Sequence, residues 1–99
     1  MTLIVTTALN RLTLETSFQM LPTDAVQYIK TTYQDTGKIL SISVKFSEDK
    51  LSRTSTVVFA DEAARKLYFS DPILKEVFDA QRAYNAANGM VVERSFEDA

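Results

Sequence analysis

The sequence lacks cysteine, histidine and tryptophan, and it contains only two glycines, Gly37 and Gly89. Without cysteine there can be no disulfide, no thiolate nucleophile and no sulfur-ligated zinc or iron–sulfur site. Without cysteine or histidine, a soft or borderline metal ion has none of its preferred ligands. Two isolated glycines cannot form a glycine-rich phosphate loop. The sequence therefore predicts no metal and no cofactor.

Long apolar runs and clusters of basic residues are also missing. No stretch approaches the roughly 20 apolar residues of a membrane span, and residues 1–8 are too short and too rich in threonine for a signal peptide. The net charge is −2, and basic residues are scattered among acidic ones: Lys38, Lys45, Lys50, Arg53, Lys66, Lys75 and Arg82. Binding of nucleic-acid phosphates needs a basic stripe. We predict no membrane and no nucleic-acid partner, and the missing disulfides favour a cytoplasmic location.

What the chain does contain is typical of a single small domain over residues 1–99. Apolar residues make up 45% of the sequence, and six phenylalanines and four tyrosines argue against disorder. Residues 2–9 are rich in β-branched side chains and predict a first strand. Residues 12–16 alternate again, which fits either a continuing strand or a loop.

A first helix is predicted to begin with Thr23 as its N-cap, followed by an acidic residue at the positive end of the helix dipole. Val26, Ile29 and Tyr33 would share its buried face. Gly37 would end it, because glycine adopts the left-handed conformation easily.

The clearest strand pattern lies in residues 39–46, and a polar turn at 47–50 leads to a returning strand over 51–59. The apolar face of the first of these strands carries Leu40, Ile42, Val44 and Phe46. The opposite face of the pair carries Ser41, Ser43, Lys45, Thr54, Thr56 and Val58. We expect the helices to cover the apolar face. A second subunit would cover the semi-polar face, which predicts a homodimer.

A second helical region begins with Asp61 as its N-cap and is interrupted at Asp71-Pro72, where Asp71 caps a new helix with proline in its first position. Asn88-Gly89 ends this helix, and residues 90–96 predict a last strand before a fraying acidic tail. The buried stripe of the long helix would be Ile73, Val77, Ala80 and Tyr84, with Leu74, Phe78 and Gln81 beside it. The predicted fold class is α+β, a ferredoxin-like βαββαβ antiparallel sheet with its helices on one face.

The stretch Val57–Ala64, followed by Ser70-Asp71-Pro72 and Phe78, resembles the dimeric α/β-barrel superfamily, in particular its antibiotic-biosynthesis-monooxygenase-like members. The similarity covers residues 38–96 and, more weakly, residues 2–36. It implies a homodimer whose two sheets face each other as a barrel, with a cleft between sheet and helices in each subunit. Because the similarity rests on core and cap residues, it carries little information about activity.

The sequence departs from this family where the family's chemistry lies. Haem-degrading relatives have a histidine just after the proline step, where this chain has Ile73 and Leu74. Without histidine and tryptophan, the chain also lacks the Asn-Trp-His set of the cofactor-free oxygenases. The resemblance therefore places it in a branch of the superfamily that these catalytic sets do not define.

The candidate ligand-binding residues are Tyr33, Phe78, Tyr84 and Asn85. Tyr84 or Asn85 would supply the polar anchor for a ligand, and an amide at the end of the long helix could steady an enolate or oxyanion. The alternatives are ordinary helix-end and core roles, because a buried tyrosine usually packs its ring and finds a partner for its hydroxyl. Tyr28 and Tyr68 are further sources of a phenolic donor.

Glu93 and Arg94 lie on opposite faces of the last strand, so one of them should point into the barrel or cleft. A buried carboxylate there could act as a general base, and Glu15 is a weaker candidate for that role. An exposed charge or a salt bridge between subunits is the alternative.

Three functions fit these residues. The first is binding of a mainly apolar small molecule in a cleft between sheet and helices. The second is a cofactor-free oxygenase or isomerase acting on an aromatic or polyketide-like substrate. The third is an oligomerising structural or accessory protein, such as a viral component. A titratable group in the cleft would favour the second function over the first, and a large external apolar patch over a filled core would favour the third.

Overall fold

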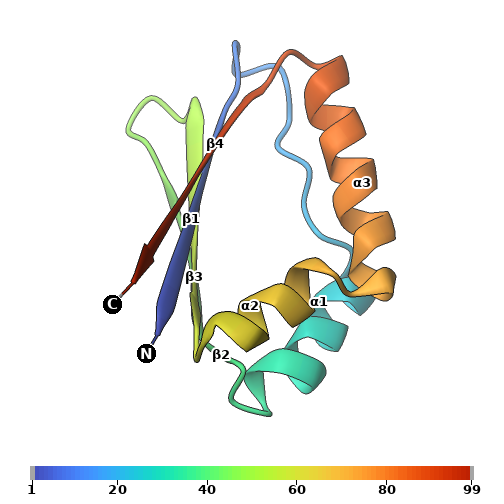
Figure 1. The fold of residues 1–99 in the computed structure, drawn as a ribbon. Helices are drawn as coiled ribbons and strands as arrows, with labels where there is room; N and C mark the ends of the chain where they lie inside the picture. Colours follow the sequence, from blue (N-terminus) through green and yellow to red (C-terminus); the bar gives the residue numbers. More distant parts are fainter. Residues whose placement is uncertain (1, 99) are drawn as a thin grey trace.

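The computed structural model describes residues 2–98, which form a four-stranded antiparallel sheet with all helices on one side (Figure 1). The strands are β1 (Leu3–Asn10), β2 (Ile39–Phe46), β3 (Ser52–Phe59) and β4 (Val91–Asp98). The helices are α1 (Thr23–Ile29), its π-helical continuation η1 (Lys30–Gln34), α2 (Glu62–Phe69) and α3 (Pro72–Ala87). The βαββαβ succession and the strand order β2-β3-β1-β4 confirm the predicted ferredoxin-like α+β fold.

Strand β1 lies in the middle of the sheet, between two strands that come much later in the chain. Leu3 lies opposite both Phe59 of β3 and Asp98 of β4. Because side chains alternate along a strand, this register defines an inner face directed at the helices. The inner face carries Leu3, Val5, Thr7, Leu9, Ile39, Ile42, Val44, Phe46, Arg53, Ser55, Val57, Phe59, Val92, Arg94, Phe96 and Asp98.

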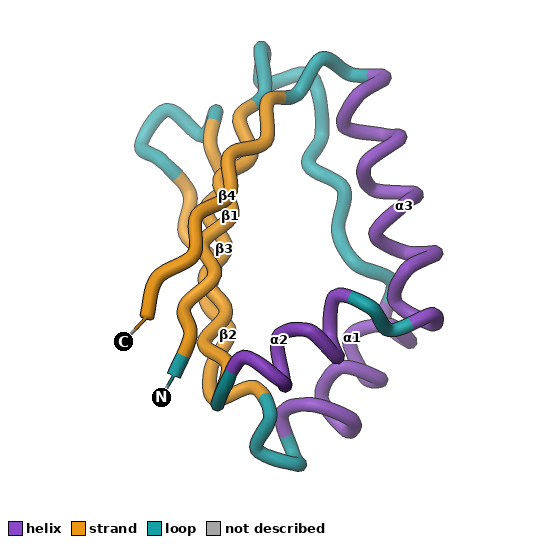
Figure 2. The backbone as a smooth tube through the Cα atoms, in the orientation of Figure 1, coloured by secondary structure: helices purple, strands orange, loops and turns teal. Residues whose placement is uncertain are grey.

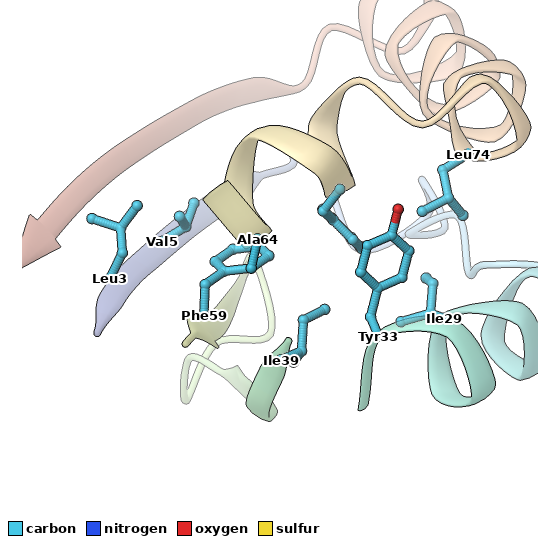
Figure 3. Packing of buried hydrophobic residues seen from close by; sticks show 9 residues of the cluster. Leu3, Val5, Ile29, Tyr33, Ile39, Phe59, Ala64 and Leu74 are labelled. Carbon is cyan, nitrogen blue, oxygen red and sulfur yellow. The ribbon is translucent and has the colours of Figure 1, made fainter. Parts of the chain in front are cut away.

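The core lies where α1, α2 and the first turn of α3 meet one end of the sheet (Figure 3). Val5, Tyr33, Phe59 and Leu74 are its most deeply buried large side chains. The ring of Tyr68 packs edge-on against two of these residues. Its centre lies 5.2 Å from the ring centre of Tyr33 and 5.4 Å from that of Phe59. Each fully buried large apolar side chain contributes about 1.5–3 kcal/mol, so this cluster is a major source of stability.

Residues 11–22, which we call the strap, connect β1 to α1 without regular secondary structure and pass between the sheet and α3 (Figure 2). An Nη of Arg53 on the sheet donates to the Gln19 carbonyl at 3.2 Å. The Tyr84 hydroxyl on α3 donates to the Ser17 carbonyl at 2.6 Å. The strap therefore joins the sheet to α3, and residues 12–16 form a loop, not a continuing strand.

Helix α1 differs from its prediction in both its cap and its buried face. Pro22 occupies the N-cap position and Thr23 is already helical, so the predicted Thr23 cap is wrong. Val26 is 51% exposed, which also contradicts its predicted burial. The buried residues are Ala25, Ile29 and Tyr33. Their spacing of four residues suits this helix because the i→i+5 turn of η1 is wider than an α-helical turn.

Helix α3 buries most of the predicted residues but not the first of its predicted stripe. Ile73 heads the predicted buried stripe but is 58% exposed. Ala80 of that stripe is exposed as well. Val77 and Tyr84 are half-buried as predicted, as are Phe78 and Gln81 beside them, and Leu74 is buried. In the first turn, Asp71 caps the helix and Leu74, not Ile73, packs into the core.

Strand β2 is an edge strand that the helices leave largely uncovered. Ile42, Val44 and Phe46 point to the inner face as predicted, but their side chains are 40–51% exposed. The register is broken between Ile39 and Ser41, so Leu40 does not lie on the inner face with these three side chains. Its predicted place on that face is therefore wrong.

Strand β4 is longer than predicted. Glu97 and Asp98 pair with Ile4 and Leu3, so the expected fraying of the acidic tail is wrong for these two residues, and Ala99 lies outside the described range. Over residues 2–98, no helix has both the length and the apolar character that a bilayer crossing requires.

Candidate functional site

The inner face of the sheet carries an arginine without an acidic partner. The Nε of Arg94 donates to the hydroxyl of Thr7 at 3.1 Å. Its guanidinium carbon lies 5.1 Å from the ring centre of Phe69, a cation–π contact. Every ion pair among residues 2–98 uses other basic residues. The two Nη groups of Arg94 are therefore available to a ligand.

Tyr68 places a phenol near this guanidinium. Its ring is buried, with its centre 5.2 Å from Phe69 and 5.5 Å from Phe78. Burial raises the pKa of the Tyr68 hydroxyl to about 12, and the positive charge of Arg94 opposes this rise only in part. At neutral pH the group is thus a protonated hydrogen-bond donor.

The electrostatics of Arg94 favour an anion. Burial lowers the pKa of its guanidinium, and repulsion by the Arg82 charge lowers it further, while Tyr68 acts in the opposite direction. A partly desolvated cation that is repelled by a second cation is stabilised when a negative charge arrives. We call Thr7, Tyr68, Phe69, Phe78 and Arg94 the inner-face site.

The pairing of β1 with β4 and the N-caps of α2 and α3 bring these five residues together. Thr7 and Arg94 lie opposite each other on β1 and β4. Tyr68 and Phe69 end α2, whose N-cap Asp61 accepts a hydrogen bond from the Ala64 amide at 2.8 Å, as predicted. Phe78 comes from the second turn of α3, so its position depends on the corner between the two helices.

Asp71 fixes that corner. One carboxylate oxygen accepts hydrogen bonds from the hydroxyls of Tyr28 at 2.7 Å and Tyr33 at 2.6 Å, and the other accepts from the Ile73 amide at 2.9 Å. Burial alone would raise the pKa of Asp71, but these bonds outweigh it and lower the pKa. The predicted helix break at Asp71-Pro72 and the predicted N-cap are both confirmed.

The four predicted ligand-binding residues lie in different places. Phe78 belongs to the inner-face site, whereas Tyr33 is buried in the core with its hydroxyl on Asp71. Tyr84 and Asn85 lie near the end of α3, where Tyr84 binds the strap and the Asn85 amide oxygen is buried without a partner. Their role in ligand binding stays a prediction.

The last strand turns Arg94 inward and Glu93 outward, so the side chain that β4 contributes here is a cation and not a base. Glu15, the other acidic candidate, is exposed on the strap. The alternation of Glu93 and Arg94 indicates that one of them faces inward. Which one depends on the pairing of β4 with β1, for which the sequence carries no local signal.

Two open hollows accompany the site. One of about 260 Å³ lies between the strap and α3, lined by Gln19, Met20, Pro22, Glu76, Val77, Ala80 and Gln81. The other, of about 390 Å³, lies between the turn before β2 and the start of α2. Neither includes Arg94 or Tyr68. Arg94 itself is exposed, and Phe96, two residues further on the same face of β4, is 54% exposed, so the inner-face site is open on its β4 side. Among residues 2–98, no three acidic side chains gather to hold a metal.

No family model matches the sequence, and no curated protein matches it. Solved structures do share its fold. A single-residue variant of SnoaB, a cofactor-independent oxygenase from Streptomyces nogalater, superposes with a TM-score of 0.70 over 99% of this chain and 92% of its own, at 12% identity. A provisionally named antibiotic biosynthesis monooxygenase from Deinococcus radiodurans gives a TM-score of 0.63 over 98% of this chain and 91% of its own, at 14% identity. The structural neighbours are thus antibiotic-biosynthesis-monooxygenase-like, as the sequence resemblance implied, and at these identities the likeness establishes the fold.

Proposed function

We propose that the chain binds a planar, mainly apolar small molecule carrying one acidic oxygen, and that it does so at the inner-face site. Arg94 carries the proposal, because its guanidinium stacks on Phe69, lacks a carboxylate partner and lies near the neutral phenol of Tyr68. A phenolate, enolate or carboxylate would accept hydrogen bonds from the two Nη groups. The rings of Phe69 and Phe78 would cover the apolar part of the ligand.

The magnitudes support binding without a cofactor. Burying apolar ligand surface contributes about 25 cal/mol per Å² before the entropic costs of association. A charge-assisted hydrogen bond adds about 1.5–3 kcal/mol. An aromatic ligand with one ionised hydroxyl would therefore bind usefully with Arg94 as its main polar anchor.

A thermal-shift screen tests this prediction. Hydroxyanthraquinones and flavonoids with an ionised hydroxyl should raise the melting temperature, because the anion offsets the unpaired charge of Arg94. Their methyl ethers are the matched control and should stabilise the protein less. Fatty acids, nucleotides and divalent metals complete the panel. Stabilisation by nucleotides or metals, with none from planar acids, would contradict the proposal.

Oxygenation of such a ligand is the second candidate function, and the likeness to SnoaB over nearly the whole chain favours it. An electron-rich enolate can reduce dioxygen itself, so the protein would need only to hold the anion at Arg94 and stabilise it. For a substrate with a reactive CH₂ beside its ring, one oxygen atom would become a carbonyl and the other would leave as water. Oxygen uptake with an anthrone, compared with the spontaneous rate in buffer, separates this function from simple binding.

A homodimer through the outer face of the sheet is part of the proposal. The register places Ser43 beside Thr56 and Lys45 beside Thr54 on that face, away from the helices. The serine and threonine side chains are small and would allow a second sheet to approach to about 10 Å. Lys45 on one edge and Glu93 on the other would face each other across a two-fold axis.

Light scattering should report twice the subunit mass of 11.1 kDa. Thr56→Glu at the centre of the outer face should convert the dimer to a monomer, because like charges would meet across the interface. Lys50→Glu in the exposed hairpin turn is the control and should leave the mass unchanged. A wild-type monomer at micromolar concentration would rule the dimer out.

A further inference from the structure

Phe18 of the strap packs on the inner face of the sheet, beside Arg53 of β3 and Phe46 of β2. Its ring centre lies 4.3 Å from the guanidinium carbon of Arg11 and 5.2 Å from that of Arg53. The ring of Phe46 lies 6.1 Å away. The ring of Phe18 thus contacts two guanidinium groups, neither of which pairs with a carboxylate in residues 2–98. This contact repeats the chemistry of Arg94 on Phe69.

The two arginine–aromatic contacts lie within the length of one elongated planar molecule. Arg53 is opposite Leu9 and Arg94 is opposite Thr7, on the two strands that flank β1. Standard strand spacings put their Cα atoms about 12 Å apart, along a diagonal of the inner face. A ligand anchored at Arg94 and extended along this diagonal would meet Phe18.

Next to Phe18, the strap contains a buried polar atom that has no hydrogen-bond partner. The amide oxygen of the next residue, Gln19, is buried without a hydrogen-bond partner, and so is that of Asn85 on α3. Buried polar atoms are almost always paired, and Gln19 also lines the hollow between the strap and α3, so the strap has an unfilled hydrogen-bonding position next to Phe18.

From these contacts we infer that Phe18 is a specificity-determining residue, which limits the length of the planar ligand bound at the inner-face site. The inference rests on the proposed function. Phe18 fills the Arg11–Arg53 end of the inner face as the last ring of a longer ligand would fill it. The hydrogen bond from Tyr84 to Ser17 holds the strap, and with it Phe18, in that place.

The test compares naphthol, anthracenol and tetracenol carboxylates as a series of increasing length. The wild type should bind the short members best. Phe18→Ala should shift the ratio of affinities toward the longest member by about tenfold, the effect of burying one more ring. Leu14→Ala, at an exposed position of the same strap, is the control and should leave the ratio unchanged.

The outcomes separate the two proposals. If the wild type binds no member of the series, the proposed function fails. If it binds them and Phe18→Ala leaves the length preference as it was, only the role of Phe18 is wrong. Should Phe18→Ala fail to fold, Phe18→Leu keeps most of the packing volume and removes the cation–π contacts. It should then shift the preference in the same direction by a smaller factor, and an unchanged preference would overturn the inference.

Discussion

Replacing Asp71 by alanine should lower the free energy of unfolding by about 3 kcal/mol. The change removes the N-cap of α3 together with the acceptor for the hydroxyls of Tyr28 and Tyr33. An ordinary N-cap contributes about 1 kcal/mol, and hydrogen bonds to a buried carboxylate contribute more than neutral ones. Tyr33 would also keep a buried hydroxyl without its strong acceptor.

Urea unfolding measures this difference, and Asp61→Ala is its control. Asp61 caps α2 from an exposed position and accepts from the Ala64 amide, so its loss should cost only about 1 kcal/mol. Equal losses for the two variants would mean that Asp71 acts as a cap alone and that the two tyrosine bonds contribute nothing.

The contribution of Asp71 should also depend on pH. Its pKa is lower in the folded chain than the ordinary value of 3.8, because the bonds from Tyr33 and Tyr28 outweigh burial. The unfolded chain therefore binds this proton first as the pH falls. The stabilisation is fully present above about pH 4 and is lost as the pH falls toward the folded-state pKa. The difference between wild type and Asp71→Ala should narrow over that acidic range.

Arg94→Gln should weaken the binding of a planar acidic ligand by about 10- to 100-fold, the equivalent of one charge-assisted hydrogen bond. Without ligand, the variant should be as stable as the wild type. The reason is that Arg94 lies at an exposed position of β4 and takes part in no ion pair among residues 2–98, and substitutions at such positions usually change stability by less than about 0.5 kcal/mol. Titration calorimetry and thermal unfolding of the same samples measure both quantities.

Arg82→Gln is the matched control for charge. Arg82 is exposed and pairs with Asp79, so its loss should change affinity only slightly. The neutral methyl ether of the ligand should bind wild type and Arg94→Gln alike. A loss of affinity for the ether, or an equal loss in Arg82→Gln, would show that Arg94 does not hold the acidic oxygen.

Local patterns predicted those parts of the fold that depend on a few neighbouring residues. Strand β2 and the caps at Asp61 and Asp71 were predictable because alternation, helix capping and proline geometry act within one turn or one pleat. The bonds that Asp71 accepts from Tyr28 and Tyr33 were not, since they join residues about forty positions apart.

The candidate site was predictable only in part, for the same reason. Phe78 followed from helical spacing, but the inward direction of Arg94 follows from the pairing of β4 with β1. The sequence alone could not distinguish Tyr68 from the other three tyrosines, because its role follows from its position near Arg94 in the fold. Cation–π contacts of Phe18 likewise join residues that the sequence separates by up to 35 positions.

The pairing of Leu3 with Asp98 brings the two ends of the described chain side by side in the sheet (Figure 1). Forming this pair closes a loop of almost the whole chain, whereas the β2–β3 hairpin closes only the short turn between Phe46 and Arg53. The difference in loop-closure entropy is about 2 kcal/mol, so the hairpin should form early and β4 should dock last.

Adjacent ends also make the fold suitable for circular permutation, in which a short linker joins β4 to β1 and the chain is opened in the exposed turn at Glu48–Lys50. Such a permutant would turn the slowest pairing of the natural order into a local hairpin and should therefore fold faster than the parent chain.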